Sequence, residues 1–212
     1  MSFRMLDPAA FPRRTQFEYF CSLPNPQVGV TVPVDVTEAR RFAGDRDCSF
    51  FLVFLHLAAL AANSVPELRL RIRGGGIAAY DRCDTSHTEL PESGVYCYCT
   101  LRHDMPWEAY LPYARETRAR RLQHPSLAED EDVESQIFVS ALPWLGYTQL
   151  IQPTGGPADS HPRISWGRFA ENPEGRLMMP VTLQCHHALV DGIHIARFYD
   201  QLNGLIRALP GA

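Results

Sequence analysis

The sequence has no long apolar segment, and this absence argues against a protein that crosses a membrane through helices. The longest apolar run covers residues 50–62, and His56 interrupts it. A membrane-spanning helix needs roughly 20 consecutive apolar residues, so this run is too short. The first residues also lack the long apolar centre of a signal peptide. We therefore expect a soluble, cytoplasmic protein with no membrane partner.

Excess charge and paired cysteines are missing as well. The formal net charge is −4, which gives no reason to expect a nucleic-acid partner. No two of the six cysteines form a CxxC pair, so we expect free thiols in a reducing compartment. Internal repeats and linkers are absent, and 212 residues are enough to bury one sizeable core. We expect a single domain over residues 1–212.

The pattern of apolar residues predicts the order of strands and helices. Strands are expected at residues 28–36, 68–73, 77–80, 94–101, 137–141, 163–169 and 181–187. Helices are expected in a short segment ending at Phe42, in an apolar segment after Ser49, at residues 107–123, and from about residue 192 onward. We expect the first twenty residues to form an extended arm. Because strands and helices are interspersed without strict alternation, we expect an α+β fold with a mixed or antiparallel sheet and helices packed on one side.

Residues 184–198 form the most informative segment of the chain. Strand alternation from residue 181 to 187 places Val181, Leu183, Cys185 and His187 on one face, and Thr182, Gln184 and His186 on the other. His187 is thus predicted to lie on the apolar side. Burial disfavours imidazolium, so this histidine would be neutral and able to accept a proton. The pattern indicates a general base.

Three interpretations of this segment are open from the residues alone. His187, Asp191 and His194 are spaced as metal ligands on a helical face would be, although Gly192 separates a strand from a helix here. Asp191 could instead be only the N-cap of the last helix, with structural histidines before it. In the third interpretation His187 is a base and Asp191 fixes its geometry through an ion pair with an arginine near the start of the chain.

Four segments together resemble the chloramphenicol acetyltransferase family. The segment HHALVDG, with IHIARF after it, resembles the family's active-site motif, and Arg13-Arg14 with Phe17-Glu18 is similar to a basic pair near its start. FVSALPW at residues 138–144 and SWGRF at residues 165–169 resemble two further segments in the same order. The resemblance implies a two-layer sandwich with a mixed sheet, and an acetyl-CoA-dependent O-acetyltransferase that needs no metal.

The resemblance also implies roles for individual residues. His187 matches the general base that takes a proton from an acceptor hydroxyl, and Ser140 matches the serine that stabilises the oxyanion of the tetrahedral intermediate. Asp191 matches a structural aspartate paired with an arginine at the position of Arg13. Ser165 stands where the family has a threonine that steadies the transition state through water. The family forms trimers with active sites at subunit interfaces, so a homotrimer is expected.

The acceptor, a small molecule with a hydroxyl group, is less closely specified than the chemistry. The resemblance implies substrate or coenzyme A contacts from the aromatic residues Tyr19, Phe20, Tyr98 and Phe138, and from Ser165. The family's apolar wall is acidic here at residues 127–132, and usually apolar positions hold Gln152 and Thr154. Chloramphenicol, with antibiotic resistance as the result, is the leading acceptor. The alternatives are another small hydroxylated acceptor or a non-catalytic binding protein on the same fold.

The arginine-rich segment at residues 115–121 allows two interpretations. It can be a solvated helix end that suits the helix dipole, or a site for coenzyme A phosphates.

Overall fold

The computed structural model describes residues 1–92, 94–128 and 132–210. Its larger strands and helices follow the sequence pattern closely. The strands are β1 Phe3–Leu6, β2 Gln27–Asp35, β3 Leu70–Arg73, β4 Gly76–Tyr80, β5 Thr85–Glu89, β6 Cys97–Leu101, β7 Ile137–Ala141, β8 Arg163–Trp166, β9 Ala170–Glu171 and β10 Leu177–His186. The helices are α1 Arg14–Cys21, α2 Thr37–Asp45, α3 Phe50–Asn63, α4 Trp107–Gln123 and α5 Gly192–Arg207. Most of the acidic segment, residues 129–131, lies outside the described residues.

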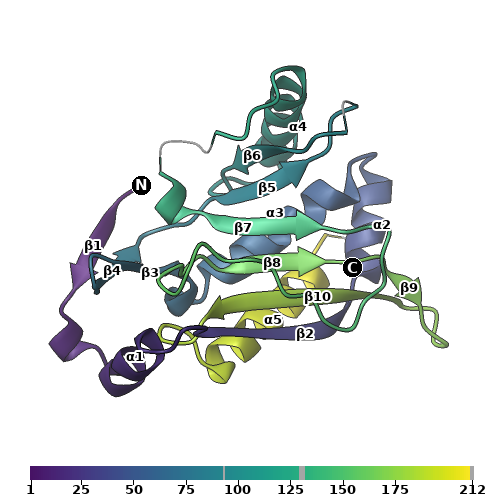
Figure 1. The fold of residues 1–212 in the computed structure, drawn as a ribbon. Helices are drawn as coiled ribbons and strands as arrows, with labels where there is room; N and C mark the ends of the chain where they lie inside the picture. The colour runs from purple at the N-terminus through teal and green to yellow at the C-terminus, as the bar shows by residue number, and fades with distance from the viewer. Residues whose placement is uncertain (93, 129–131, 211–212) are drawn as a thin grey trace.

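A mixed sheet dominates the molecule (Figure 1). In the described part of the chain it has seven strands in the order β2-β10-β8-β7-β5-β6, with β9 pairing to β10. β5 and β8 each run parallel to β7, and the other pairs are antiparallel. This arrangement confirms the expected α+β two-layer sandwich with a mixed sheet.

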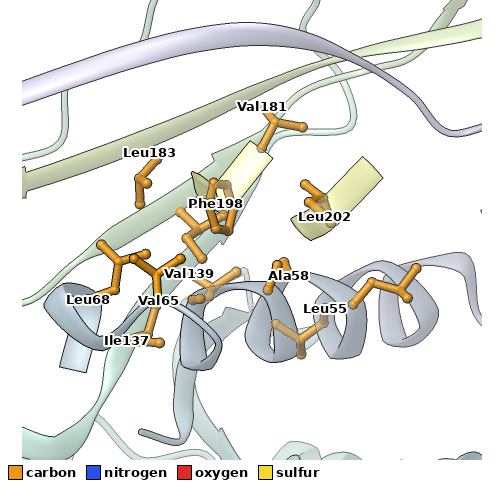
Figure 2. Close-up of a cluster of buried hydrophobic side chains, with 14 of the residues drawn as sticks. Leu55, Ala58, Val65, Leu68, Ile137, Val139, Val181, Leu183, Phe198 and Leu202 are labelled. Atoms are coloured by element: carbon orange, nitrogen blue, oxygen red, sulfur yellow. The ribbon is translucent and has the colours of Figure 1, made fainter. Parts of the chain in front are cut away.

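The helices α3 and α5 cover one face of this sheet. α3 is apolar on nearly every side, and ten of its residues are buried. Figure 2 shows Leu55 and Ala58 of α3 together with Phe198 and Leu202 of α5 beside side chains of β7 and β10, among them Val139, Val181 and Leu183. Burial of these apolar side chains is the main force that holds the layers together. The core thus fixes β10, the strand that leads to the histidine pair.

The N-terminal segment differs from the expected extended arm. β1 pairs with β4 in a separate three-stranded sheet of order β1-β4-β3, and residues 14–21 form the helix α1. The hairpin between β3 and β4 turns at Gly74 and Gly75, whose φ angles of 58° and 78° favour glycine. α1 forms because its Phe17 is buried against the core while Arg14 and Glu18 pair on the exposed side. This helix carries Tyr19 and Phe20 toward the end of β10.

The segment between β7 and β8 covers part of the other face of the sheet. The backbone N–H and C=O of Gln152 both bond to the side-chain amide of Gln184 on β10, at 2.9 and 3.1 Å. His186 Nε2 lies 2.8 Å from the carbonyl oxygen of Pro157 in the same segment. β10 is therefore covered on both faces, and its polar side chains Thr182, Gln184 and His186 are buried.

No described helix is long and apolar enough to cross a membrane.

Candidate active site

His187 follows the last residue of β10 and begins the turn toward α5. Its backbone N–H donates to the carbonyl of Pro26 at 2.8 Å, which fixes the start of the turn. Its imidazole stacks on the ring of Phe20 from α1, with the centroids 3.9 Å apart and the planes inclined by 11°. The side chain is 29% exposed, so a substrate can reach it. Phe20 and the turn together hold the ring in one orientation.

The hydrogen bonds of His187 determine which nitrogen carries the proton. Nδ1 lies 3.0 Å from the carbonyl oxygen of Val190, and a carbonyl can only accept. Nδ1 therefore carries the hydrogen in the neutral ring, and Nε2 keeps its lone pair. Asp191 Oδ1 is 3.3 Å from Nδ1. In this arrangement Nε2 can accept a hydrogen bond or a proton.

Arg13 joins the start of the chain to this turn. Its Nε is 2.9 Å from Asp191 Oδ2, and its two terminal nitrogens donate to the backbone carbonyls of His187 and Ala188 at 3.1 and 3.4 Å. The guanidinium thus makes an ion pair with the carboxylate and hydrogen bonds to two carbonyls, which its rigid plane of donors allows. Asp191 is at the same time the N-cap residue of α5, so the ion pair and the cap occur together.

His194 is occupied by contacts within the chain. Its Nδ1 accepts from the backbone N–H of Asp191 at 2.9 Å, and its Nε2 lies 3.5 Å from Glu67 Oε1. Among the described residues, no group of three or more His, Cys, Asp or Glu side chains is placed to hold a metal ion. Asp191 is therefore the N-cap residue of α5 and the ion-pair partner of Arg13.

The expected burial of His187 on the apolar face is wrong, because the strand ends one residue earlier. The alternation holds from Val181 to His186, after which the chain turns. It is His186 that is buried, with only 1% of its surface exposed. Its Nε2 donates to Pro157, and its Nδ1 accepts from the N–H of Ala188 at 3.2 Å. Burial lowers the pKa of His186.

A second group of predicted site residues lies on the sheet face opposite the helices. Ser140 on β7 is in register with Ser165 on β8, which is in register with Thr182 on β10. The Ser165 hydroxyl accepts a hydrogen bond from the side-chain amide of Gln152. Ser140 lines a cavity of about 280 Å³ with Tyr98, Phe138 and Gln152. The hydroxyls of Ser140 and Ser165 thus stand side by side on one sheet face.

Aromatic and charged side chains make the wall of this cavity rigid. Phe138 stacks on His161 at 4.6 Å between centroids, and Tyr98 packs against Tyr96 at 5.7 Å. Arg163 is buried beside Phe138 and pairs with Asp159 through two hydrogen bonds of 3.2 and 2.6 Å. Burial would raise the pKa of Asp159, but hydrogen bonds from His161 and Arg163 outweigh it and hold that pKa far below its usual range.

The two groups of residues do not meet within one chain. Thr182 lies in the same row as Ser140, and His187 is five residues further along the chain. At about 3.3 Å per residue this separates Ser140 from His187 by roughly 16 Å along the strand direction. The structure therefore brings together His187, Asp191, Arg13, Phe20 and Tyr19, and separately Ser140, Ser165, Tyr98 and Phe138.

Sequence reasoning missed the connections made by amides and backbone carbonyls. Gln152 stood out in the sequence only as a polar residue at a usually apolar position, and Gln184 only as a member of a strand face. Nothing in their spacing of 32 residues reveals that they bond. The carbonyl of Val190, which fixes the proton on His187, has no signal in the side-chain pattern.

Two arginines at the arginine-rich end of α4 form contacts within the chain. Arg118 pairs with the buried Glu89 of β5, and Arg115 donates to the carbonyl of Asp47 at 2.7 Å. Arg120 and Arg121 line a separate open cavity with Thr117 and His124. The helix runs through Pro112 without a break.

Fold and sequence comparisons both point to acyltransferases. A solved chloramphenicol acetyltransferase superposes with a TM-score of 0.84 at 25% identity, covering 97% of this chain and 100% of that one. The cubic core of the pyruvate dehydrogenase multienzyme complex shares the fold, with a TM-score of 0.68 at 16% identity over 92% of this chain and 86% of that one. The protein is thus an enzyme of the acyltransferase class.

Sequence relatives narrow the class. Chloramphenicol acetyltransferase 3 of Escherichia coli is 25% identical over 211 residues, covering 97% of each chain. Chloramphenicol acetyltransferase 2 of Haemophilus influenzae is 25% identical over 209 residues, covering 95% of this chain and 96% of its own. The family described as chloramphenicol acetyltransferase matches residues 1–203. The chain belongs to the chloramphenicol acetyltransferase family.

Proposed function

We propose that the protein is an acetyl-CoA-dependent O-acetyltransferase that transfers an acetyl group directly to the hydroxyl of a small acceptor, with chloramphenicol as the leading acceptor. Family membership implies an acyl-coenzyme A donor. The observation that carries the proposal is the tautomer of His187, because Nδ1–H faces the Val190 carbonyl and leaves Nε2 able to accept a proton. Acetylation of chloramphenicol would give antibiotic resistance.

The proposed reaction needs one base and one oxyanion donor. His187 Nε2 takes the proton of the acceptor hydroxyl as its oxygen attacks the thioester carbonyl. The hydroxyl of Ser140 donates to the oxyanion of the tetrahedral intermediate, with Ser165 beside it in the next strand. Collapse of the intermediate breaks the carbon–sulfur bond, and the imidazolium returns its proton to the departing thiolate. Asp191 and Arg13 are positioning residues for the ring.

Such a reaction requires the base and the oxyanion donor within a few ångströms of one carbonyl group. The separation of roughly 16 Å between the rows of Ser140 and His187 in one chain supports an active site shared between copies of the chain. We therefore infer a homotrimer in which one subunit supplies His187 and its neighbour supplies Ser140. Phe20 and Tyr19 would then face Tyr98 and Phe138 across the subunit boundary.

The cytoplasm is the proposed location. All six cysteines are free thiols, and four of them are buried. Unpaired cysteines are typical of a reducing compartment such as the cytoplasm.

A thiol-release assay tests the proposed function. The purified protein is mixed with acetyl-CoA and chloramphenicol, and free coenzyme A is measured with a thiol reagent. Release that requires both substrates supports the proposal, and mass spectrometry of the drug should show one added acetyl group. Release without an acceptor would indicate hydrolysis. The absence of transfer to any hydroxyl compound at high enzyme concentration would contradict the proposal.

A further inference from the structure

We propose that the acceptor is a small, neutral, hydroxyl-rich molecule, and that Gln152 is the residue that selects it. This inference rests on the proposed function, because it takes the cavity beside Ser140 as the acceptor subsite. The cavity of about 280 Å³ is too small for coenzyme A, and a compact acceptor fits it. The acceptor hydroxyl must also react near Ser140, where the oxyanion forms.

Hydroxyl groups are part of the cavity lining, together with apolar and aromatic groups. Side chains with a hydroxyl come from Thr88 of β5, from Tyr96, and from Ser140 of β7. Each hydroxyl can both donate and accept a hydrogen bond. Apolar contact comes mainly from Phe138 and Pro153. An acceptor with several hydroxyls finds partners here, whereas an apolar one would remove water from these groups and give them nothing in return.

The charge of the cavity favours a neutral acceptor. Arg163 is the charged side chain among its described lining residues, and Asp159 binds this guanidinium through both carboxylate oxygens. A third hydrogen bond goes from Arg163 to the carbonyl of His161 at 3.0 Å. His87 also borders the cavity, but its Nε2 points to Glu89 at 2.9 Å. The net charge presented to a ligand is therefore small.

Gln152 forms the polar wall between this cavity and its neighbour. Its backbone is held in place by the Gln184 amide, which is 4% exposed, through the two hydrogen bonds of 2.9 and 3.1 Å. Its side-chain amide donates to the buried Ser165 hydroxyl. Because Ser165 accepts from Gln152, the hydroxyl hydrogen of Ser165 stays available as a donor. Gln152 borders both this cavity and the cavity along the edge strand β2.

Replacement of the Gln152 amide by an apolar group should change acceptor choice more than it changes the chemistry. Gln152→Met keeps the length of the side chain and removes both polar atoms. The wall becomes apolar, and the buried Ser165 hydroxyl loses its donor. Leaving a polar group unpaired in a substrate pocket changes the ratio of kcat/KM between two acceptors by about 10- to 100-fold.

Two primary alcohols with the same six-membered-ring frame test the inference. Methyl α-D-glucopyranoside and cyclohexylmethanol both carry a CH2OH group on a six-membered ring, but only the glucoside bears ring hydroxyls. With acetyl-CoA as donor, kcat/KM for the two is measured by thiol release. The wild-type protein should prefer the glucoside by at least about 10-fold, and Gln152→Met should shift the ratio toward cyclohexylmethanol by about 10- to 100-fold.

Gln149→Met is the matched control. Gln149 belongs to the same segment and is exposed, and it lines only the cavity along β2. Its substitution should leave the ratio within about twofold of the wild-type ratio, as expected for a position away from the reacting groups. Circular dichroism confirms that both variants are folded. If Gln152→Met does not fold, the ratio of kcat/KM for the two alcohols in the wild-type protein tests the inference without the variant.

The outcomes separate this inference from the proposed function. Acetyl transfer with a preference for cyclohexylmethanol, or an unchanged ratio in Gln152→Met, would overturn the inference and leave the acetyltransferase function in place. If neither alcohol is acetylated, calorimetric binding of the two alcohols to the wild-type protein and to Gln152→Met decides. Weaker binding of the glucoside than of cyclohexylmethanol overturns the inference, and a preference for the glucoside that Gln152→Met removes supports it.

Discussion

At the scale of the residue, the two adjacent histidines have opposite hydrogen-bond patterns. His187 holds its hydrogen on Nδ1 against a carbonyl and presents Nε2, whereas His186 donates from Nε2 to Pro157 and accepts at Nδ1. Only the first pattern leaves a basic nitrogen free to meet a substrate. The neighbours of each ring, and not the order HH in the sequence, determine which one can act as a base.

The first prediction concerns the two histidines. His187→Ala should lower kcat by about 10²- to 10⁴-fold with little change in thermal stability, because general-base catalysis contributes that much. His186→Ala removes two buried hydrogen bonds and should lower the free energy of unfolding by about 2 kcal/mol. The folded fraction of that variant should keep kcat within about 10-fold of the wild type, since His186 supplies no reacting atom. Steady-state kinetics and urea unfolding of both variants check this, and reversed results would make His186 the base.

The second prediction concerns Arg13. Arg13→Lys keeps the charge but cannot bond to Asp191 and two carbonyls at once, so it should lose about 10-fold or more in kcat and about 1–3 kcal/mol in stability. Arg14→Lys is the matched control, because Arg14 is exposed and pairs only with Glu18 on the same helix. That control should change stability by less than about 0.5 kcal/mol. Steady-state kinetics and urea unfolding measure both variants. Equal losses of kcat and stability at the two positions would mean that the guanidinium geometry of Arg13 has no special role.

The family resemblance and the strand alternation predicted part of the site, whereas contacts that only the fold creates could not be predicted. The resemblance to the family predicted the ion pair of Arg13 with Asp191, which the structure contains. Alternation predicted the faces of β10 up to His186 and failed at His187, because nothing in the pattern shows where a strand ends and a turn begins. The bond from Gln152 to Ser165 joins two segments that only the tertiary structure brings together.

At the scale of the element, segments with a marked apolar pattern or a helix-start signal were predicted, whereas β5 and α1 were not. α3 and α5 have clear apolar patterns, and both occur as expected. β5 has the sequence TSHTE, which shows no apolar alternation, yet four of its five residues are buried. Its place between β6 and β7 buries it, and its polar side chains find partners there. α1 was missed because one buried residue, Phe17, is too little to define a period.

The third prediction concerns the contact between β5 and α4. Glu89 is 7% exposed and accepts hydrogen bonds from Arg118 and His87. Burial raises its pKa, but these hydrogen bonds outweigh burial and lower the pKa of Glu89 to about 2. A carboxyl whose folded pKa lies below its unfolded value of 4.5 stabilises the fold above that pH and loses this effect as the pH falls toward 2.

Glu89→Gln should therefore lower the free energy of unfolding by about 3 kcal/mol at pH 7. The difference from the wild type should shrink steadily between pH 5 and about 2, because the wild-type carboxylate becomes protonated in that window. Urea unfolding followed by tryptophan fluorescence at several pH values measures this difference. A difference that stays constant with pH would show that packing, and not charge, is what Glu89 contributes.

At the scale of the whole molecule, the order of the strands decides what the site can be. β10 and β7 are separated by β8, and His187 lies beyond the end of β10 while Ser140 lies in the row of Thr182. The strand order could not be obtained from the sequence pattern, since periodicity tells which residues face a core but not which strands are neighbours. The resemblance supplied the expectation of shared sites, and the register supports that proposal because it keeps Ser140 and His187 apart within one chain.

The fourth prediction tests the shared site by mixing two inactive variants. His187→Ala lacks the base and Ser140→Ala lacks the oxyanion donor, so each should be nearly inactive alone. When the two are denatured and refolded together in equal amounts, every mixed trimer with cyclic symmetry contains one site that joins an intact His187 to an intact Ser140. Random mixing makes about three quarters of the trimers mixed, and so restores roughly one quarter of the wild-type sites. Thiol release from the co-refolded sample, compared with each variant refolded alone and with the two mixed after folding, measures the recovery. If the active site is contained within one chain, the co-refolded sample should show no recovery of activity. Differently tagged subunits that elute together in size-exclusion chromatography confirm that mixed oligomers have formed, so that a lack of recovery then contradicts the shared site.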